Sequence, residues 1–171
     1  MSKKLDLLKA TSRVISDSGV NRLTLDAVAQ EANVSKGGLL YHYATKDELI
    51  KALNLHVLEN FRKLIEKHVA TGSSYHEAYI LATLDSLKKD DVTTSLLASI
   101  STNRELLNLW REEYKYINEK LSKEDYKIEY SLLVKSVCHG LWFSDLFHFE
   151  QIDHDDKQKL INYLFDLLKE D

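Results

Sequence analysis

The fold is decided by residues 24–49, which read TLDAVAQEANVSKGGLLYHYATKDEL. Thr24 is a good N-cap for a short helix that follows it. Asn33 tolerates the left-handed turn that ends this helix. Ser35 then caps a second short helix, which we expect to run over residues 35–43. Two short helices separated by a tight turn are typical of a helix-turn-helix.

The residue types in this stretch separate an inner face from an outer face. The small Ala29 and Ala32 allow the helices to cross closely, and Leu39 and Tyr43, four residues apart, seat the second helix on the core. The residues left outside are Lys36, Gly37, Gly38, Tyr41 and His42. Lysine reaches phosphates or guanine edges, glycine allows close approach to a groove, and Tyr and His donate to phosphate oxygens, so this set suits DNA.

The rest of the chain predicts an all-α protein of about nine helices. It has no proline and only five glycines. Capping boxes, in which Ser, Thr or Asp precedes an acid by three residues, occur at Thr45, Ser74, Ser122 and Asp153. Together with the apolar periodicity they predict helices at about 4–18, 45–70, 75–89, 92–101, 103–121, 123–149 and 154–169, in addition to the two of the helix-turn-helix.

Charge is distributed unevenly between the two ends of the chain. The net charge of −4 argues against a general nucleic-acid coat. Residues 1–51 nevertheless hold eight Lys and Arg against six Asp and Glu, and the remaining residues hold 15 against 21. The basic balance therefore accompanies the helix-turn-helix, although an excess of two is a weak electrostatic footprint.

Cysteine content and hydropathy point to a cytoplasmic protein. The single Cys138 cannot form an internal disulfide, and the start MSKKLD lacks the apolar stretch of a signal peptide. No apolar run reaches the length needed to span a bilayer, so we expect no membrane association.

The motif over Thr24 to Leu49, placed near the N-terminus, resembles the TetR family of repressors. The resemblance implies an N-terminal three-helix helix-turn-helix DNA-binding domain over residues 1–44 and a C-terminal helical ligand-binding and dimerisation domain over residues 45–171. It also implies that Tyr43 occupies a core position. With Gly38 from the exposed face, the predicted DNA-contact set is Thr24, Ser35, Lys36, Gly37, Gly38, Tyr41, His42 and Lys46.

Two positions depart from the family pattern. Gly38 stands where the family often has Thr or another polar residue, and Leu40 stands where a phosphate-contacting Tyr is usual. Leu40 either touches a thymine methyl or packs inward. Lys36 and Lys46 can also be ordinary solvated charges, and His42 can satisfy a local hydrogen bond.

Two helices carry more apolar side chains than one interface absorbs. The helix at about 123–149 is apolar on more than one side, and the helix at about 154–169 has the same character. We therefore expect these helices to form a homodimer.

The resemblance places an inducer in the C-terminal half, where aromatic residues accompany a few polar ones. The predicted ligand set is His56, Asn60, Tyr79, Trp110, Tyr114, His139 and Trp142. A plain hydrophobic core with tyrosine hydroxyls at its edge explains any one of these residues equally well. The ligand is an unknown small molecule, and no cofactor is implied.

Metal binding and catalysis have little support in the spacing. Seven histidines are present, but His148 and His154 straddle a predicted helix junction, and Cys138 and His139 point to different sides of a helix. Neither a phosphate loop nor a nucleophile motif stands out, so an enzyme is not expected. The sequence predicts a ligand-responsive DNA-binding regulator, the alternative being a helical dimer that binds small molecules or proteins without reading DNA.

Overall fold

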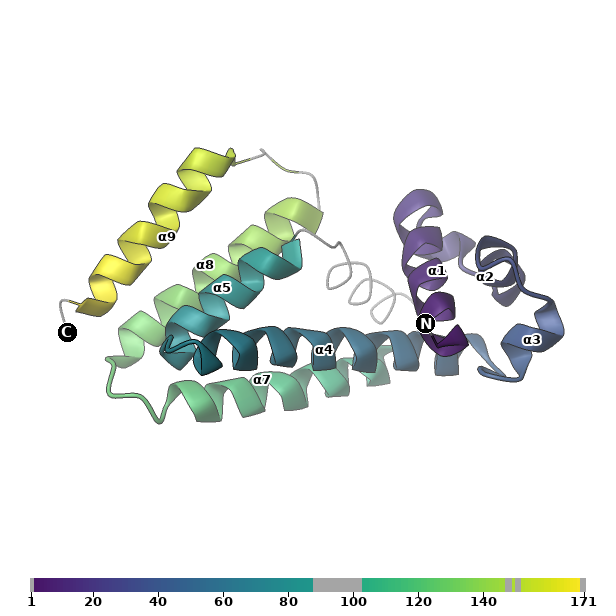
Figure 1. Ribbon diagram of the computed structural model, residues 1–171, viewed down its shortest axis with the longest axis horizontal. Coiled ribbons are helices and arrows are strands. Elements are labelled where there is room, and N and C mark those ends of the chain that lie inside the picture. Colours follow the sequence, from purple (N-terminus) through teal and green to yellow (C-terminus); the bar gives the residue numbers. More distant parts are fainter. Residues whose placement is uncertain (1, 88–102, 147–148, 150–151, 170–171) are drawn as a thin grey trace. The chain divides into compact units, whose positions relative to one another are not determined.

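The computed structural model describes residues 2–87, 103–146, 149 and 152–169, and all regular structure in these ranges is helical (Figure 1). The described residues form two compact units. The first contains those of Met1–Glu59 and Asp90–Glu112, and the second contains those of Asn60–Lys89 and Glu113–Asp171. The expectation of an all-α fold is confirmed for the described residues. The predicted helix at about 92–101 lies outside them.

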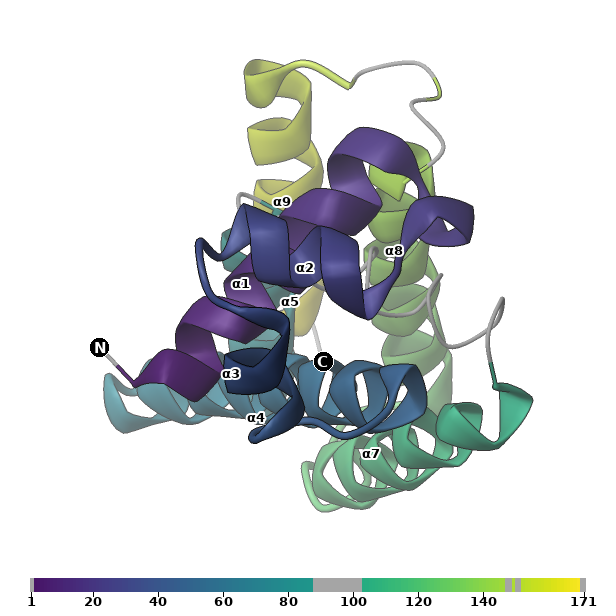
Figure 2. The same ribbon diagram turned by 90° about the vertical axis from the view of Figure 1, so that its right-hand side faces the viewer.

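The first unit is built on the packing of its N-terminal helices (Figure 2). Its elements are α1 (Lys3–Ser18), the 3₁₀ turn η1 (Val20–Arg22), α2 (Leu25–Glu31), α3 (Lys36–Leu40), the first part of α4 (Lys46–Ala70), the 3₁₀ turn η2 (Arg104–Leu106) and the start of α7 (Leu107–Leu121). α1 packs on η1 and α2, and α2 packs on α3. The core side chains include Leu7, Leu8, Ile15, Leu23, Val28, Ala29, Leu39, Tyr43, Leu49, Ile50 and Leu53.

Local signals fix the breaks between these helices as expected. Thr24 Oγ1 accepts the Ala27 N–H at 3.1 Å and so caps α2. Asn33 has φ 53°, the left-handed conformation that reverses the chain before α3. At the start of α4, Thr45 Oγ1 accepts the Glu48 N–H at 3.1 Å, and the Glu48 carboxylate accepts the Ala44 N–H at 2.9 Å.

The second unit is a layered group of longer helices, in which α5 lies along α8 (Figure 1). It contains the last part of α4, α5 (Tyr75–Leu87), most of α7, α8 (Ile128–Leu146) and α9 (His154–Lys169). The Tyr130 hydroxyl of α8 donates to the Leu164 carbonyl of α9 at 2.8 Å. The largest buried side chains include Ile65, Tyr79, Ile80, Ile117 and Leu164.

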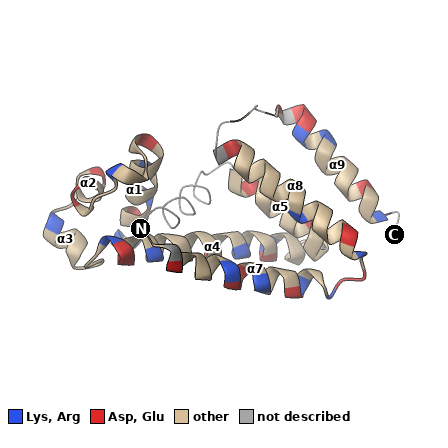
Figure 3. Cartoon of the chain, turned by 180° about the vertical axis from the view of Figure 1, so that it is seen from behind, with Lys and Arg blue, Asp and Glu red and all other residues tan. Residues whose placement is uncertain are grey.

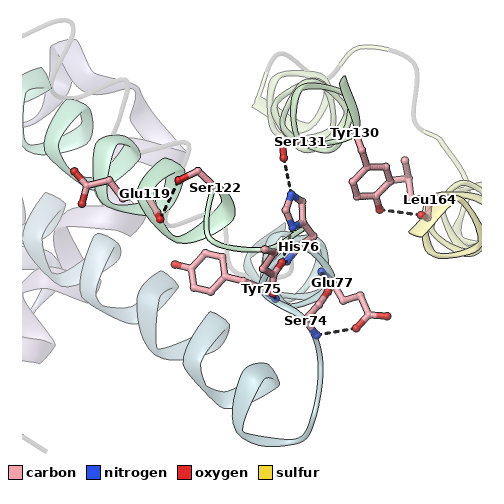
Figure 4. A network of polar contacts seen from close by, with 10 residues as sticks. Ser74, Tyr75, His76, Glu77, Glu119, Ser122, Tyr130, Ser131 and Leu164 are labelled. Carbon is pink, nitrogen blue, oxygen red and sulfur yellow. Dashed lines mark hydrogen bonds and ion pairs between the residues drawn. The ribbon is translucent and has the colours of Figure 1, made fainter. Parts of the chain in front are cut away.

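Capping boxes begin two helices of this unit, whereas the third predicted box is wrong. Ser74 and Glu77 exchange backbone and side-chain hydrogen bonds at the start of α5 (Figure 4). Asp153 Oδ1 accepts the Asp156 N–H at 2.8 Å at the start of α9. Ser122 caps no helix, because its hydroxyl donates back to the Glu119 carbonyl at 3.2 Å and α8 begins only at Ile128.

In the described part of the chain, none of the helices combines the length and the apolar character that a membrane span requires.

Candidate nucleic-acid interface and aromatic cluster

α3 is held by its own cap and by two buried side chains. Ser35 Oγ accepts the Gly38 N–H at 3.1 Å. Leu39 and Tyr43 are only 0% and 7% exposed, and burial raises the pKa of the Tyr43 phenol. α3 ends at Leu40, short of the predicted residue 43, because the Leu39 carbonyl accepts both the His42 and Tyr43 N–H groups as the chain turns. One face of α3 is thus fixed on the core and the other is exposed.

The predicted DNA-contact set surrounds this exposed face. Tyr41 is 85% exposed, and its ring makes an edge-to-face contact with that of the half-buried His42, with the two ring centroids 5.1 Å apart. Lys46 is half-buried at the start of α4. The remaining members, which are exposed, are Thr24, Ser35, Lys36, Gly37 and Gly38.

The two positions that depart from the family pattern differ in how much room they leave. Leu40 is 39% exposed, so its side chain is partly available outside the core. A Cβ added at Gly38 would lie 3.3 Å from Ser35 Oγ, whereas one added at Gly37 would meet nothing within 4 Å. Gly38 therefore leaves room for the cap of α3, and Gly37 is open on its outer side.

Two ion pairs that the sequence did not reveal attach α2 to its neighbours. Lys36 Nζ lies 2.9 Å from Asp26 Oδ2, and Arg13 Nε lies 2.6 Å from Glu31 Oε1. α3 carries a basic residue and α2 carries acidic ones (Figure 3). The partners lie 10 and 18 residues apart on different helices, so no helical spacing rule could have paired them.

Four members of the predicted ligand set come together in the second unit. The Tyr79 hydroxyl lies 3.5 Å from His139 Nε2. The centroid of the His139 ring is 5.2 Å from that of the Tyr114 ring. The His139 ring also stacks on that of Trp142, with the centroids 6.0 Å apart. Phe61, which the sequence did not single out, packs edge-on against Tyr79 and Trp142. We call these five residues the aromatic cluster.

The titratable groups of the aromatic cluster are neutral near pH 7. Burial, and then the charge of Lys135, lowers the pKa of His139 below its ordinary 6.5. Burial raises the pKa of Tyr79 and of Tyr114 well above the usual range, and raises that of the neighbouring Cys138 thiol to about 12. The aromatic cluster therefore offers ring faces and uncharged hydrogen-bonding groups.

The other three members of the predicted ligand set have different surroundings. Trp110 is 6% exposed in the first unit, and its indole N–H donates to Asn54 Oδ1 at 2.6 Å. His56 is half-buried and also belongs to the first unit. Asn60 is half-buried where the second unit's share of α4 begins.

A buried polar chain that the sequence did not predict ties α5 to α8 and to the turn between α7 and α8. His76 is 0% exposed, and its Nε2 lies 2.7 Å from Ser131 Oγ (Figure 4). Its Nδ1 contacts the Glu124 carboxylate, which also accepts the Tyr75 and His76 N–H groups. Glu124 thus supplies a negative charge and two acceptors to the first turn of α5, where free N–H groups favour an anion.

The order Ser131, His76, Glu124 is that of a hydrolytic triad, but its placement is structural. Ser131 is only 7% exposed near the start of α8, and its N–H is directed at the Lys127 carbonyl. A serine nucleophile needs an accessible hydroxyl and donors aimed at the developing oxyanion. These three residues therefore serve to fasten the helices together.

Comparison with known proteins matches most of the chain in two parts. Residues 7–53 match the model of bacterial regulatory proteins of the tetR family, and residues 73–169 match that of the tetracyclin repressor-like C-terminal domain. The chain belongs to the TetR family. The matched N-terminal segment contains α3 and all eight residues of the predicted DNA-contact set.

Relatives with similar sequence match a little less than half of the chain. The transcriptional regulator BetI of Burkholderia thailandensis is 34% identical over 80 residues, which are 47% of this chain and 41% of that protein. An uncharacterised regulator of Haemophilus influenzae is 30% identical over 73 residues, 43% of this chain and 39% of that protein. The matched segment therefore spans about two fifths of the length of these relatives.

Solved structures share the fold over nearly the whole chain. A regulator from a Rhodococcus species has a TM-score of 0.71 at 17% identity, covering 96% of this chain and 97% of that one. The multidrug binding protein EbrR, solved with imidazole, has a TM-score of 0.65 at 20% identity, covering 96% and 95%. At these identities the likeness is one of fold.

Proposed function

We propose that this TetR-family chain is a ligand-responsive transcriptional regulator that binds a palindromic DNA operator as a homodimer and represses the adjoining genes. The observation that carries the proposal is α3, a short capped helix whose Leu39 is buried and whose outer residues Lys36 and Gly37 are exposed, as is Tyr41 directly after it. Such a helix fits the major groove, with its N-terminal residues nearest the base edges. In this proposal residues 1–44 bind DNA and residues 45–171 bind ligand and dimerise.

Exposed apolar side chains on α8 and α9 support a homodimer. Leu132 and Phe143 on α8 are 52% and 50% exposed, and Tyr163 on α9 is 61% exposed. A second copy covering these helices would remove this apolar area from water. Two-fold symmetry then requires two half-sites separated by whole turns of the duplex.

The aromatic cluster supports a small, largely apolar ligand. The relative EbrR is a multidrug binding protein. In this chain Tyr79, Tyr114 and His139 would supply the few hydrogen bonds that orient such a ligand between ring faces. A ligand that binds the conformation with low DNA affinity better than the DNA-binding one would lower the affinity of the dimer for DNA, by up to the ratio of the two ligand affinities.

Selection of DNA tests the proposal directly. The full chain is used to enrich duplexes from a random library, and affinity for the enriched duplex and a shuffled duplex is measured by fluorescence anisotropy at several salt concentrations. We expect an inverted repeat, steep weakening with salt, and loss of discrimination in Lys36→Ala. Lys115→Ala, which removes an exposed lysine on α7 in the second unit, is the matched control. Failure to enrich any duplex at low salt would refute DNA binding.

Tryptophan fluorescence tests the ligand proposal. Trp110→Phe leaves Trp142 of the aromatic cluster as the one tryptophan, because the chain has two. Titration with imidazole, indole and a panel of other small aromatic compounds should identify one that changes Trp142 emission and also releases the enriched duplex. If every compound that changes the Trp142 emission leaves the enriched duplex bound, ligand binding at the aromatic cluster does not control DNA binding.

The alternative is a dimeric binding module that does not read DNA. One observation favours it: the charge of Lys36, the single cation of α3, is engaged by Asp26. The selection experiment separates the two functions, since such a module would enrich no sequence.

A further inference from the structure

The pairing of Lys36 with Asp26 bears on how the chain chooses its DNA sequence. Lys36 Nζ lies 2.9 Å from Asp26 Oδ2, joining the first residue of α3 to the first turn of α2. Both side chains are exposed, at 58% and 67% respectively, so the pair stands at the surface beside the open Gly37.

The pair changes what Lys36 can offer to DNA. A phosphate contact depends on net positive charge, because the gain comes from releasing counterions from the duplex. A base contact depends on directed donors, and a lysine ammonium has three, of which Asp26 occupies one. With its charge balanced and two N–H groups left, Lys36 is better suited to the O6 and N7 atoms of a guanine than to a phosphate.

We propose that Asp26 is a specificity-determining residue, which weakens the attraction of Lys36 for DNA phosphates and positions its ammonium group for a base edge. This inference rests on the proposed DNA-binding function. It explains how the N-terminal part of the chain, with its small basic excess, selects a sequence: on a wrong sequence the pair contributes no net attraction, whereas on the right one Lys36 gains a base contact.

Asp26→Asn tests the inference in the full-length chain, using the enriched duplex and its shuffled counterpart. The freed lysine should raise affinity for the shuffled duplex by about three- to tenfold and steepen its salt dependence by about 0.9 in the log–log slope. Affinity for the enriched duplex should rise less, so discrimination falls. Asp26→Glu, which keeps the charge, should behave like the original chain.

Two further variants separate this mechanism from a general charge effect. Glu31→Gln also removes one acid from an ion pair on α2, and it should change affinity for the shuffled duplex by less than about twofold. Asp26→Asn combined with Lys36→Ala should cancel the gain on the shuffled duplex, because the gain acts through Lys36.

The outcomes distinguish this inference from the proposed function. If the original chain discriminates between duplexes but Asp26→Asn matches Glu31→Gln, or if the double variant keeps the gain, Asp26 has no role in specificity. If the original chain enriches no duplex, the DNA-binding proposal itself fails.

Discussion

Individual buried residues in the second unit serve different purposes according to their partners. His76 has both ring nitrogens engaged, by Glu124 and by Ser131, whereas His139 is half-buried among aromatic rings. The contacts of His76 fasten helices together, and those of His139 leave a neutral donor and acceptor in the aromatic cluster.

His139 should make stability depend on pH. Burial lowers its pKa in the folded chain below 6.5, so protons bind the unfolded chain more readily. The stability contributed by neutral His139 is complete above its ordinary pKa and is lost as the pH falls below about 6.5. Urea unfolding at pH 7.5 and 5.5 should show a smaller decrease for His139→Gln than for the original chain. Equal decreases would show that protonation of His139 is not coupled to folding.

Glu124→Gln should lower the free energy of unfolding by about 1–3 kcal/mol, because it replaces a charged acceptor of two α5 N–H groups with a neutral amide. Glu119→Gln is the control, since Glu119 is exposed nearby on α7 and should change stability by less than about 0.5 kcal/mol. Urea denaturation measures both. Equal effects of the two substitutions would contradict the capping role of Glu124.

At the scale of elements, most helix starts and ends are governed by neighbours close in sequence, whereas the start of α8 is coupled to a distant contact. α3 keeps its Ser35 cap yet ends at Leu40, where the Leu39 carbonyl accepts two N–H groups of the turn. α8 begins at Ile128 because the preceding segment carries Glu124 to the start of α5.

Gly140→Ala should stabilise α8. A Cβ there would meet nothing within 4 Å in the described part of the chain, and alanine is favoured over glycine in a helix by about 0.5–1 kcal/mol. Gly72→Ala is the matched contrast. The backbone φ at Gly72 is 103°, a value that residues with a side chain rarely adopt, so the same change should destabilise the protein. Thermal unfolding distinguishes the two. Destabilisation by Gly140→Ala together with loss of a dimer would indicate that a second copy packs against this position.

At the scale of the whole molecule, the proposed homodimer should depend on the exposed apolar side chains of α8. Leu132→Glu places a charge where Leu132 is 52% exposed, and it should convert a dimer into a monomer in sedimentation velocity. Affinity for the enriched duplex should then fall by at least about tenfold, because two half-sites are no longer bound together.

Leu55→Glu is the control for this change. Leu55 is 41% exposed on α4 within the first unit, away from α8 in the sequence, and its substitution should leave the dimer intact. Dimers that persist in Leu132→Glu, or that are lost equally in Leu55→Glu, would argue against an interface through α8.

The helical class, the helix-turn-helix and most helix starts follow from local sequence patterns alone. The caps of Thr24, Ser35, Thr45, Ser74 and Asp153 form as expected. Each bond joins residues three apart, so the information needed is contained within one helical turn. The burial of Leu39 and Tyr43 follows from the same spacing.

The packing of helices against one another sets which distant polar groups meet. The Asp26–Lys36 pair joins residues 10 apart, and the contact of Glu124 with His76 joins residues 48 apart. The same packing brings the aromatic cluster together and places the Trp110 indole N–H within hydrogen-bonding distance of Asn54 Oδ1. Hydropathy and capping specify that a helix forms and which face it buries, but the direction in which two helices cross determines the side chains that come within hydrogen-bonding distance.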